Sequence, residues 1–461
     1  MAGIGFTLRR LVRRDDLLGV LEGYVYSALV STGPWLFTIL ALGAITVVGG
    51  YAVSFREISV FRLIVIYNFA FSLVFTSPVY MVTTRYLADL IYAKDVRYAP
   101  GMLVGALVFV GVTQGALVIP FYFFVAGLPD VVRLAAVLHY FLVAGLWVVS
   151  VFLSAIKAYG VITRLFGLGM ALALGLTSLL AAYAGVAGML LGFSCGLAFI
   201  FFGLTARVLA EYPYPLVAPF SFLGYFRRYW ELALGGLAYN CAIWVDKWVM
   251  WLSPRAEEIV SGMPSYPNYD SAMFLAYLSI IPAMAMFLVS VETRFFEHYL
   301  RFYRDIQAHA TLRRIRSNLG ALLTTFVSSA RNLVVLQGSV SIILLLLAPR
   351  LFEVLHISFA QMGIFRLGVL GAYFHVLLAL MVVILTYFDF RRVVLTLQTV
   401  FLLANLGFTY ASLYWGVNYY GFGYYLGSIF TFAVCFLVGF RYIRDLPYQA
   451  FIRNNLSVTK T

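Results

Sequence analysis

Charged side chains are scarce in this chain, and that scarcity excludes an ordinary soluble enzyme. Asp, Glu, Lys and Arg make up only 11% of the 461 residues, whereas hydrophobic residues make up 63%. A typical soluble domain carries about 25% charged residues. The three cysteines, Cys195, Cys241 and Cys435, have no metal-ligand spacing, and there is no glycine-rich nucleotide-binding motif. We therefore expect no metal centre, no cofactor and no ATP-hydrolysing domain.

The chain has instead a long series of apolar runs. About twelve of them are long enough to cross a bilayer, and they must be helices because hydrocarbon offers the backbone no other hydrogen-bond partner. The predicted fold class is therefore an all-α polytopic membrane protein of about twelve transmembrane helices. The predicted spans are residues 24–50, 61–88, 101–126, 132–156, 163–184, 186–209, 229–252, 271–293, 326–348, 364–387, 393–415 and 421–441.

Basic residues are distributed unevenly between the predicted connecting segments. If the N-terminus is cytoplasmic, most of the 32 Lys and Arg residues lie on the cytoplasmic side, as the positive-inside rule expects. An even number of spans then places both termini in the cytoplasm. The net charge of +13 is explained by this orientation and by anionic membrane lipids, and not by nucleic acid.

A proline-rich stretch at 211–228 leaves six predicted spans on each side, and we predict that it is a cytoplasmic linker between two lobes. Residues 294–317 are predicted as a basic cytoplasmic helix, which is either a lipid anchor and orientation signal or a docking site for a cytoplasmic partner. The other predicted parts are an interfacial amphipathic helix at 1–22, an N-terminal lobe at 23–210, a C-terminal lobe at 229–441 and a cytoplasmic tail at 442–461.

Two adjacent charges in the seventh predicted span are the strongest candidates for a functional site. Asp246 and Lys247 lie past the midpoint of that span, where a charge costs several kcal/mol unless it meets water or a partner. Adjacent helical residues point about 100° apart, so we expect that the two do not simply neutralise each other. Asn240, Trp244 and Lys247 follow at helical spacing and predict one polar face. Static pairing across a helix interface is the alternative.

Six further polar side chains are predicted along a substrate pathway. They are Glu22 and Tyr26 at the start of the first span, Asn68 and Arg85 in the second, Glu292 in the eighth and Arg331 in the ninth. Arg85 lies near the inner end of its span, where snorkelling to lipid headgroups explains it equally well. Glu292 also fits an interfacial position.

A membrane-embedded transferase is an alternative interpretation. A membrane acyltransferase needs a buried catalytic histidine, and His139 and His375 lie inside predicted spans, although a lone intramembrane histidine is more often a packing residue. A polyprenyl-dependent glycosyltransferase needs an acidic residue in a large outer loop, whereas the loop at 51–60 is short and offers only Glu57. The aromatic residues at the outer ends of the last two spans fit an interfacial belt or a sugar platform.

Three short motifs open the chain: Met-Ala-Gly-Ile-Gly-Phe-Thr-Leu-Arg-Arg-Leu at 1–11, Glu-Gly-Tyr at 22–24 and Ser-Thr-Gly-Pro-Trp at 31–35. They resemble the start of the PelG family, the polytopic inner-membrane components of the bacterial Pel exopolysaccharide system. The resemblance implies the multidrug/oligosaccharidyl-lipid/polysaccharide flippase superfamily, in which two six-helix lobes alternate access to a central hydrophilic cavity. It also implies a multi-pass protein of the bacterial inner membrane.

The resemblance further implies the cargo and the partners. The cargo would be a cationic, hexosamine-rich polysaccharide made by a cytoplasmic glycosyltransferase similar to PelF, and the membrane partners would be similar to PelD and PelE. The leading hypothesis is therefore a polysaccharide transporter, not an enzyme, in which Asp246→Ala keeps its fold but lowers secretion. The alternatives are an ion-driven flippase of lipid-linked oligosaccharide, the transferases above, and a scaffold that assembles the synthase.

Overall fold

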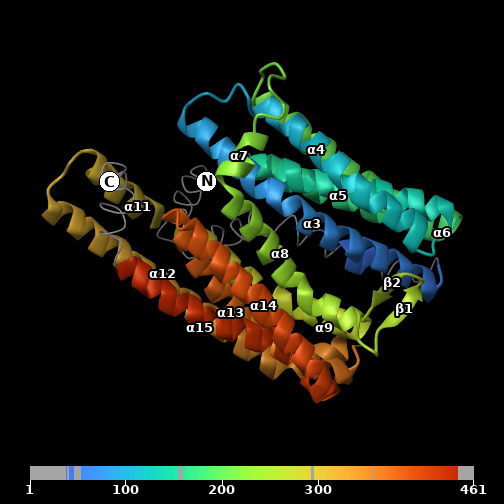
Figure 1. Ribbon diagram of the computed structural model, residues 1–461. Helices are drawn as coiled ribbons and strands as arrows, with labels where there is room; N and C mark the ends of the chain where they lie inside the picture. Colours follow the sequence, from blue (N-terminus) through green and yellow to red (C-terminus); the bar gives the residue numbers. More distant parts are fainter. Residues whose placement is uncertain are drawn as a thin grey trace. The chain divides into compact units, whose positions relative to one another are not determined.

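The computed structural model describes Thr38 and residues 41–45, 53–153, 159–291, 295–355 and 357–444. Within these ranges the chain is almost entirely helical, and the strands form one short hairpin (Figure 1). Nine segments of the described chain are long and apolar enough to cross a membrane. Almost all of the predicted first span lies outside the described residues.

The first half of the described chain is a bundle of long helices. Its first helix begins with a reciprocal cap, because the Ser54 hydroxyl accepts from the Glu57 amide while the Glu57 carboxylate accepts from the Ser54 amide. Each helix packs against the next, with α5 in contact with α3, α4 and α6. The elements are α3 (Phe55–Tyr92), α4 (Ala99–Pro120), the π-helical η1 (Phe121–Val125), α5 (Asp130–Leu153) and α6 (Tyr159–Glu211).

The 53-residue element α6 is two helices joined by a sharp kink. Ala184 and Gly185 leave the helical conformation, and Gly185 adopts φ +53°, which favours glycine. The two arms fold back on each other, since a Cβ at Gly192 would lie 2.5 Å from the backbone nitrogen of Thr177. The predicted boundary between the spans 163–184 and 186–209 is therefore confirmed. Counting α6 twice and adding α8 accounts for every predicted span after the first.

The proline-rich segment 211–228 packs on α4 and ends in the short helix α7 (Leu223–Arg228). The backbone of Val217 lies against Gly101, and the Pro219 carbonyl lies so close to Gly105 that a Cβ there would clash. Two glycines one helical turn apart, which have no side chains, thus let the backbone of this segment lie directly against α4. The loop is held by backbone contacts with the first helices of the chain.

The helix α8 (Trp230–Trp251) follows, and then the antiparallel hairpin of β1 (Glu257–Val260) and β2 (Met263–Ser265). The hairpin is attached to the helices of the first half: the Gly127 amide donates to the Ser261 carbonyl at 2.9 Å, and the Tyr67 hydroxyl donates to the Pro264 carbonyl. The predicted eighth span is broken, because α9 (Pro267–Leu278) and α10 (Ile281–Ser290) are separated by a turn.

The predicted single basic helix at 294–317 is wrong. The structure has α11 (Phe296–Gln307), a turn, and then α12 (Leu312–Val354). His309 adopts φ +51°, and the Ala310 amide donates to the Asp305 carbonyl at 2.9 Å, which ends α11. No glycine or proline lies in this turn to signal it in the sequence.

The last three long helices run side by side (Figure 1). Gly423 and Gly427 let α15 approach α14 closely, since a Cβ at Gly427 would lie 2.9 Å from the Asn405 Cα. Gly371 makes the same kind of contact between α13 and the ring of Tyr424. The elements are the 3₁₀ turn η3 (Phe359–Gln361), α13 (Met362–Tyr387), α14 (Arg391–Trp415), the 3₁₀ turn η4 (Val417–Tyr419) and α15 (Phe422–Arg444).

Contacts divide the described chain into two compact units. The first takes in the described residues within Met1–Asn240, Met250–Pro267 and Met284–Ser329, and the second those within Cys241–Val249, Asn268–Ala283 and Ala330–Thr461. The divisions run through α8, α10 and α12, and a further one follows the first residue of α9. The lobes proposed at 23–210 and 229–441 stay a prediction.

Candidate functional site

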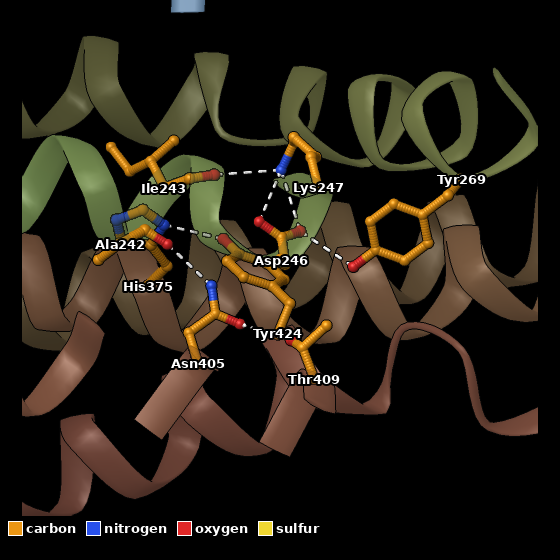
Figure 2. Close-up of polar contacts among 9 residues, drawn as sticks. All are labelled: Ala242, Ile243, Asp246, Lys247, Tyr269, His375, Asn405, Thr409 and Tyr424. Atoms are coloured by element: carbon orange, nitrogen blue, oxygen red, sulfur yellow. Dashed lines mark hydrogen bonds and ion pairs between the residues drawn. The ribbon is translucent and has the colours of Figure 1, made fainter. Parts of the chain in front are cut away.

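The helix α8 brings Asp246 and Lys247 together in the second unit (Figure 2). The Lys247 Nζ lies 3.0 Å from both carboxylate oxygens of Asp246 and 3.1 Å from the Ile243 carbonyl oxygen. Asp246 is completely buried and Lys247 is 7% exposed. The expectation that the two do not neutralise each other is wrong. The long lysine chain bends back along its own helix, although the two Cα–Cβ bonds diverge.

Aromatic rings surround this ion pair. The Tyr269 hydroxyl of α9 donates to Asp246 Oδ2 at 2.9 Å. The Lys247 Nζ lies 4.7 Å from the centroid of the Tyr277 ring and 5.8 Å from that of Trp244. Both rings lie within the distance at which a cation is attracted to an aromatic face. Asp246 therefore contacts a second helix, and both charges have partners within the protein.

Further hydrogen bonds beside the pair join α8 to α14 and α13 to α15 (Figure 2). The Asn405 amide donates to the Ala242 carbonyl at 2.8 Å, and the Thr409 hydroxyl donates to Asn405 Oδ1 at 3.1 Å. His375 Nδ1 and the Tyr424 hydroxyl are 2.8 Å apart. The close glycine contacts of α15 bring Tyr424 and Asn405 to this position. His375 is buried in helix packing, which is the interpretation the sequence favoured over a catalytic base.

The first unit contains a separate polar cluster around Asn68. Its amide nitrogen lies 2.9 Å from both the Ala136 carbonyl oxygen and His139 Nδ1, and its carbonyl accepts from the Tyr122 hydroxyl at 2.6 Å. Asn68 is 1% exposed and His139 is 0% exposed. The cluster joins α3, η1 and α5, and it leaves the His139 ring no access to an acyl donor in this state.

Arg85 takes part in a third contact, at the end of α3. Its Nε lies 3.3 Å from Asp89 Oδ1, and its guanidinium lies 5.1 Å from the centroid of the Tyr229 ring. Outside the predicted spans, burial and the negative charge of Asp89 raise the pKa of the neighbouring Tyr225. Arg85 is thus held by protein groups rather than extended toward lipid headgroups.

The remaining predicted pathway residues are not gathered at one place. Asn240 lies on α8 but in the first unit, and its amide donates to the Gly236 carbonyl of its own helix at 2.9 Å. Arg331 is exposed on α12. Glu22, Tyr26 and Glu292 lie outside the described residues. Of the predicted set, the structure joins only Trp244, Asp246 and Lys247 within its described part.

Sequence reasoning missed the tyrosines of this site. Tyr269 and Tyr277 lie on α9, two helical turns apart, and their side chains contact Asp246 and Lys247 respectively. The repeat of eight residues within an apolar helix was a usable signal. It is weak, because the chain has 32 tyrosines and tyrosine is common in membrane proteins.

The ion pair is buried and electrically balanced, with one ammonium facing one carboxylate. The Asp246 carboxylate accepts from an ammonium and a phenol, so its oxygens suit an ammonium donor. No group of three or more His, Cys, Asp or Glu side chains able to hold a metal occurs among the described residues.

Comparison with known proteins identifies the fold. The chain aligns with a MOP superfamily transporter from Pyrococcus furiosus at 16% identity and a TM-score of 0.62, over 92% of this chain and 96% of that one. An outward-facing MATE family multidrug transporter matches at 14% identity and a TM-score of 0.62, over 97% and 99%. An inward-facing MATE transporter matches at 16% and 0.59, over 88% and 95%. The predicted fold class, an all-α polytopic membrane protein with a fold like that of these transporters, is confirmed.

These identities establish the fold and not the cargo. No curated protein matches the chain. The model of the PelG family, described as an exopolysaccharide exporter, matches residues 1–451.

Proposed function

Because the chain belongs to the PelG family of exopolysaccharide exporters, we propose that it moves a cationic, hexosamine-rich polysaccharide across the bacterial inner membrane. The family and the transporter fold make it a membrane transporter rather than a membrane-embedded transferase. A hydrated sugar chain cannot cross bare hydrocarbon, because its hydroxyl groups would lose their hydrogen bonds to water. Alternating access of two lobes around a hydrophilic cavity supplies such a passage.

The buried pair of Asp246 and Lys247 is the observation that supports this cargo. In the described state the Lys247 ammonium forms an ion pair with the Asp246 carboxylate. The amino group of a hexosamine is also an ammonium, and the neighbouring tyrosine rings suit the C–H face of a sugar. We infer that Lys247 keeps Asp246 neutralised between transport steps, and that cargo ammonium groups replace it when the helices around α8 rearrange.

The proposed assembly couples export to synthesis. A cytoplasmic glycosyltransferase similar to PelF would deliver the growing chain, and membrane proteins similar to PelD and PelE would complete the complex. Both termini would lie in the cytoplasm, as the distribution of basic residues predicts. Synthesis on the cytoplasmic side then supplies the direction of movement.

The test is the charge-neutral double variant Asp246→Asn/Lys247→Gln. It removes both charges together, so it avoids a lone buried charge, but it leaves no carboxylate for an amino sugar. We expect normal membrane levels and at least tenfold less secreted polymer, measured with a hexosamine-specific lectin. The matched control is Glu353→Gln/Arg350→Gln, which removes an exposed ion pair of α12 in the same way and should leave secretion unchanged.

Transport into reconstituted vesicles tests recognition of the cargo's charge independently of the Asp246 variant. Export of a cationic hexosamine oligosaccharide into vesicles should exceed export of its fully N-acetylated form, because acetylation removes the ammonium. Normal secretion by the Asn/Gln variant would exclude Asp246 from the pathway. Equal export of both oligosaccharides would exclude recognition of the cargo by its charge.

A further inference from the structure

The helices α11 and α12 form a closed hairpin in the first unit. Asp305 of α11 is buried, and its carboxylate accepts from the Asn318 amide and pairs with Arg314 at 3.2 Å, both from α12. Phe302 of α11 and Ile315 of α12 are also buried. The polar contacts of Asp305 therefore hold the two helices together.

An open cavity of about 640 Å³ is lined by residues of this hairpin. Four arginines line it, two from each helix: Arg301 and Arg304 from α11, and Arg313 and Arg314 from α12. Asp305 is the one carboxylate in the lining, and it is already bound by Arg314 and Asn318. Within the described residues no ion pair is formed by the other three guanidiniums.

We propose that this cavity binds a phosphate group. Several guanidinium forks around one small space match the oxygens of a phosphate, and arginine binds such groups in pairs of parallel hydrogen bonds. The hydroxyls of Thr311 and Ser317 also line the cavity and can donate to the same oxygens. The first turn of α12 contains no acidic residue, so the positive end of the helix dipole adds to the attraction.

The size and charge of the cavity exclude other classes of ligand. A cationic polysaccharide is repelled by the excess of positive charge, and a cavity of this volume fits a headgroup or a small molecule rather than a protein segment. The basic segment is predicted to lie on the cytoplasmic side of the membrane. A phosphate can reach it there from an anionic phospholipid headgroup or from a soluble phosphate compound.

The experiment measures the binding of both phosphate sources, lipid and soluble, to the purified full-length protein. Native mass spectrometry would count retained phosphatidylglycerol against retained phosphatidylcholine, and calorimetry would titrate inorganic pyrophosphate. The test variant is Arg301→Gln/Arg304→Gln, and Arg313→Gln repeats the test on the other helix. The control is Arg391→Gln/Arg392→Gln, which removes the same charge from the start of α14.

Each arginine near an anionic phosphate contributes about fivefold in affinity, so the double variant should bind roughly 25-fold more weakly. Loss of phosphatidylglycerol alone would identify a headgroup site, and loss of pyrophosphate binding alone a soluble ligand. Equal binding by wild type and both test variants would refute the proposal, as would an equal loss in the control. Size-exclusion profiles show whether each variant is folded, and the result does not depend on the polysaccharide cargo.

Discussion

Removing Asp246 alone should destabilise the protein, because it leaves Lys247 buried without its counter-charge. The Lys247 ammonium has two contacts with the Asp246 carboxylate and one with the Ile243 carbonyl. In Asp246→Ala only the carbonyl and the rings of Tyr277 and Trp244 remain. Breaking a buried ion pair by removing one partner costs about 3–5 kcal/mol. We expect that loss in the free energy of unfolding.

Removing Lys247 as well shows whether that loss of stability comes from the unpaired lysine charge. In Asp246→Asn/Lys247→Met both charges are absent, and replacing a whole buried pair by neutral groups is often neutral or stabilising by about 1–4 kcal/mol. The double variant should therefore recover most or all of the stability lost by the single one. This differs from the expectation drawn from the sequence, that Asp246→Ala keeps its fold.

The assay is unfolding in mixed micelles, followed by tryptophan fluorescence or helical circular dichroism. Wild type, Asp246→Asn, Lys247→Met and the double variant would be compared under one condition, so that this cycle reports the coupling between the two positions, with Asp246→Ala measured beside them. A single variant as stable as wild type would refute the reasoning. A double variant as unstable as Asp246→Ala would show that the cost lies in the lost carboxylate itself.

Three further predictions concern single positions in the chain. Tyr269→Phe removes a hydrogen bond to a charged acceptor and should cost about 1.5–3 kcal/mol in the same unfolding assay; no change would mean that Asp246 finds another donor. Gly105→Ala should cost about 1–3 kcal/mol because the linker backbone fills its site, whereas Gly111→Ala, with open space on the same helix, should be neutral or slightly stabilising; equal melting temperatures would refute this. In a cysteine-free background, a cysteine at Glu258 should react with an impermeant thiol reagent added outside and one at His309 should not; the reverse pattern would invert the orientation.

Much of the fold follows from local patterns in the sequence. The spans are predicted because an apolar run of this length has one stable form in lipid, the helix. The boundary at Gly185 is predicted because one apolar run of the sequence ends just before it and the next begins just after it. The turn between α11 and α12 is not predicted, because a single residue with positive φ and one backbone hydrogen bond end α11 without a glycine or proline.

The sequence by itself determined that this protein crosses a membrane, that it shares the start of an exporter family and that Asp246 and Lys247 are costly in their span. Only the tertiary structure decided how that cost is met. The direct pairing depends on how a flexible lysine chain bends, and the tyrosine partners come from a helix more than twenty residues away in sequence. Side-chain direction and helix neighbours are properties of packing, since hydrophobic periodicity identifies the apolar face of a helix but not the residue that faces it.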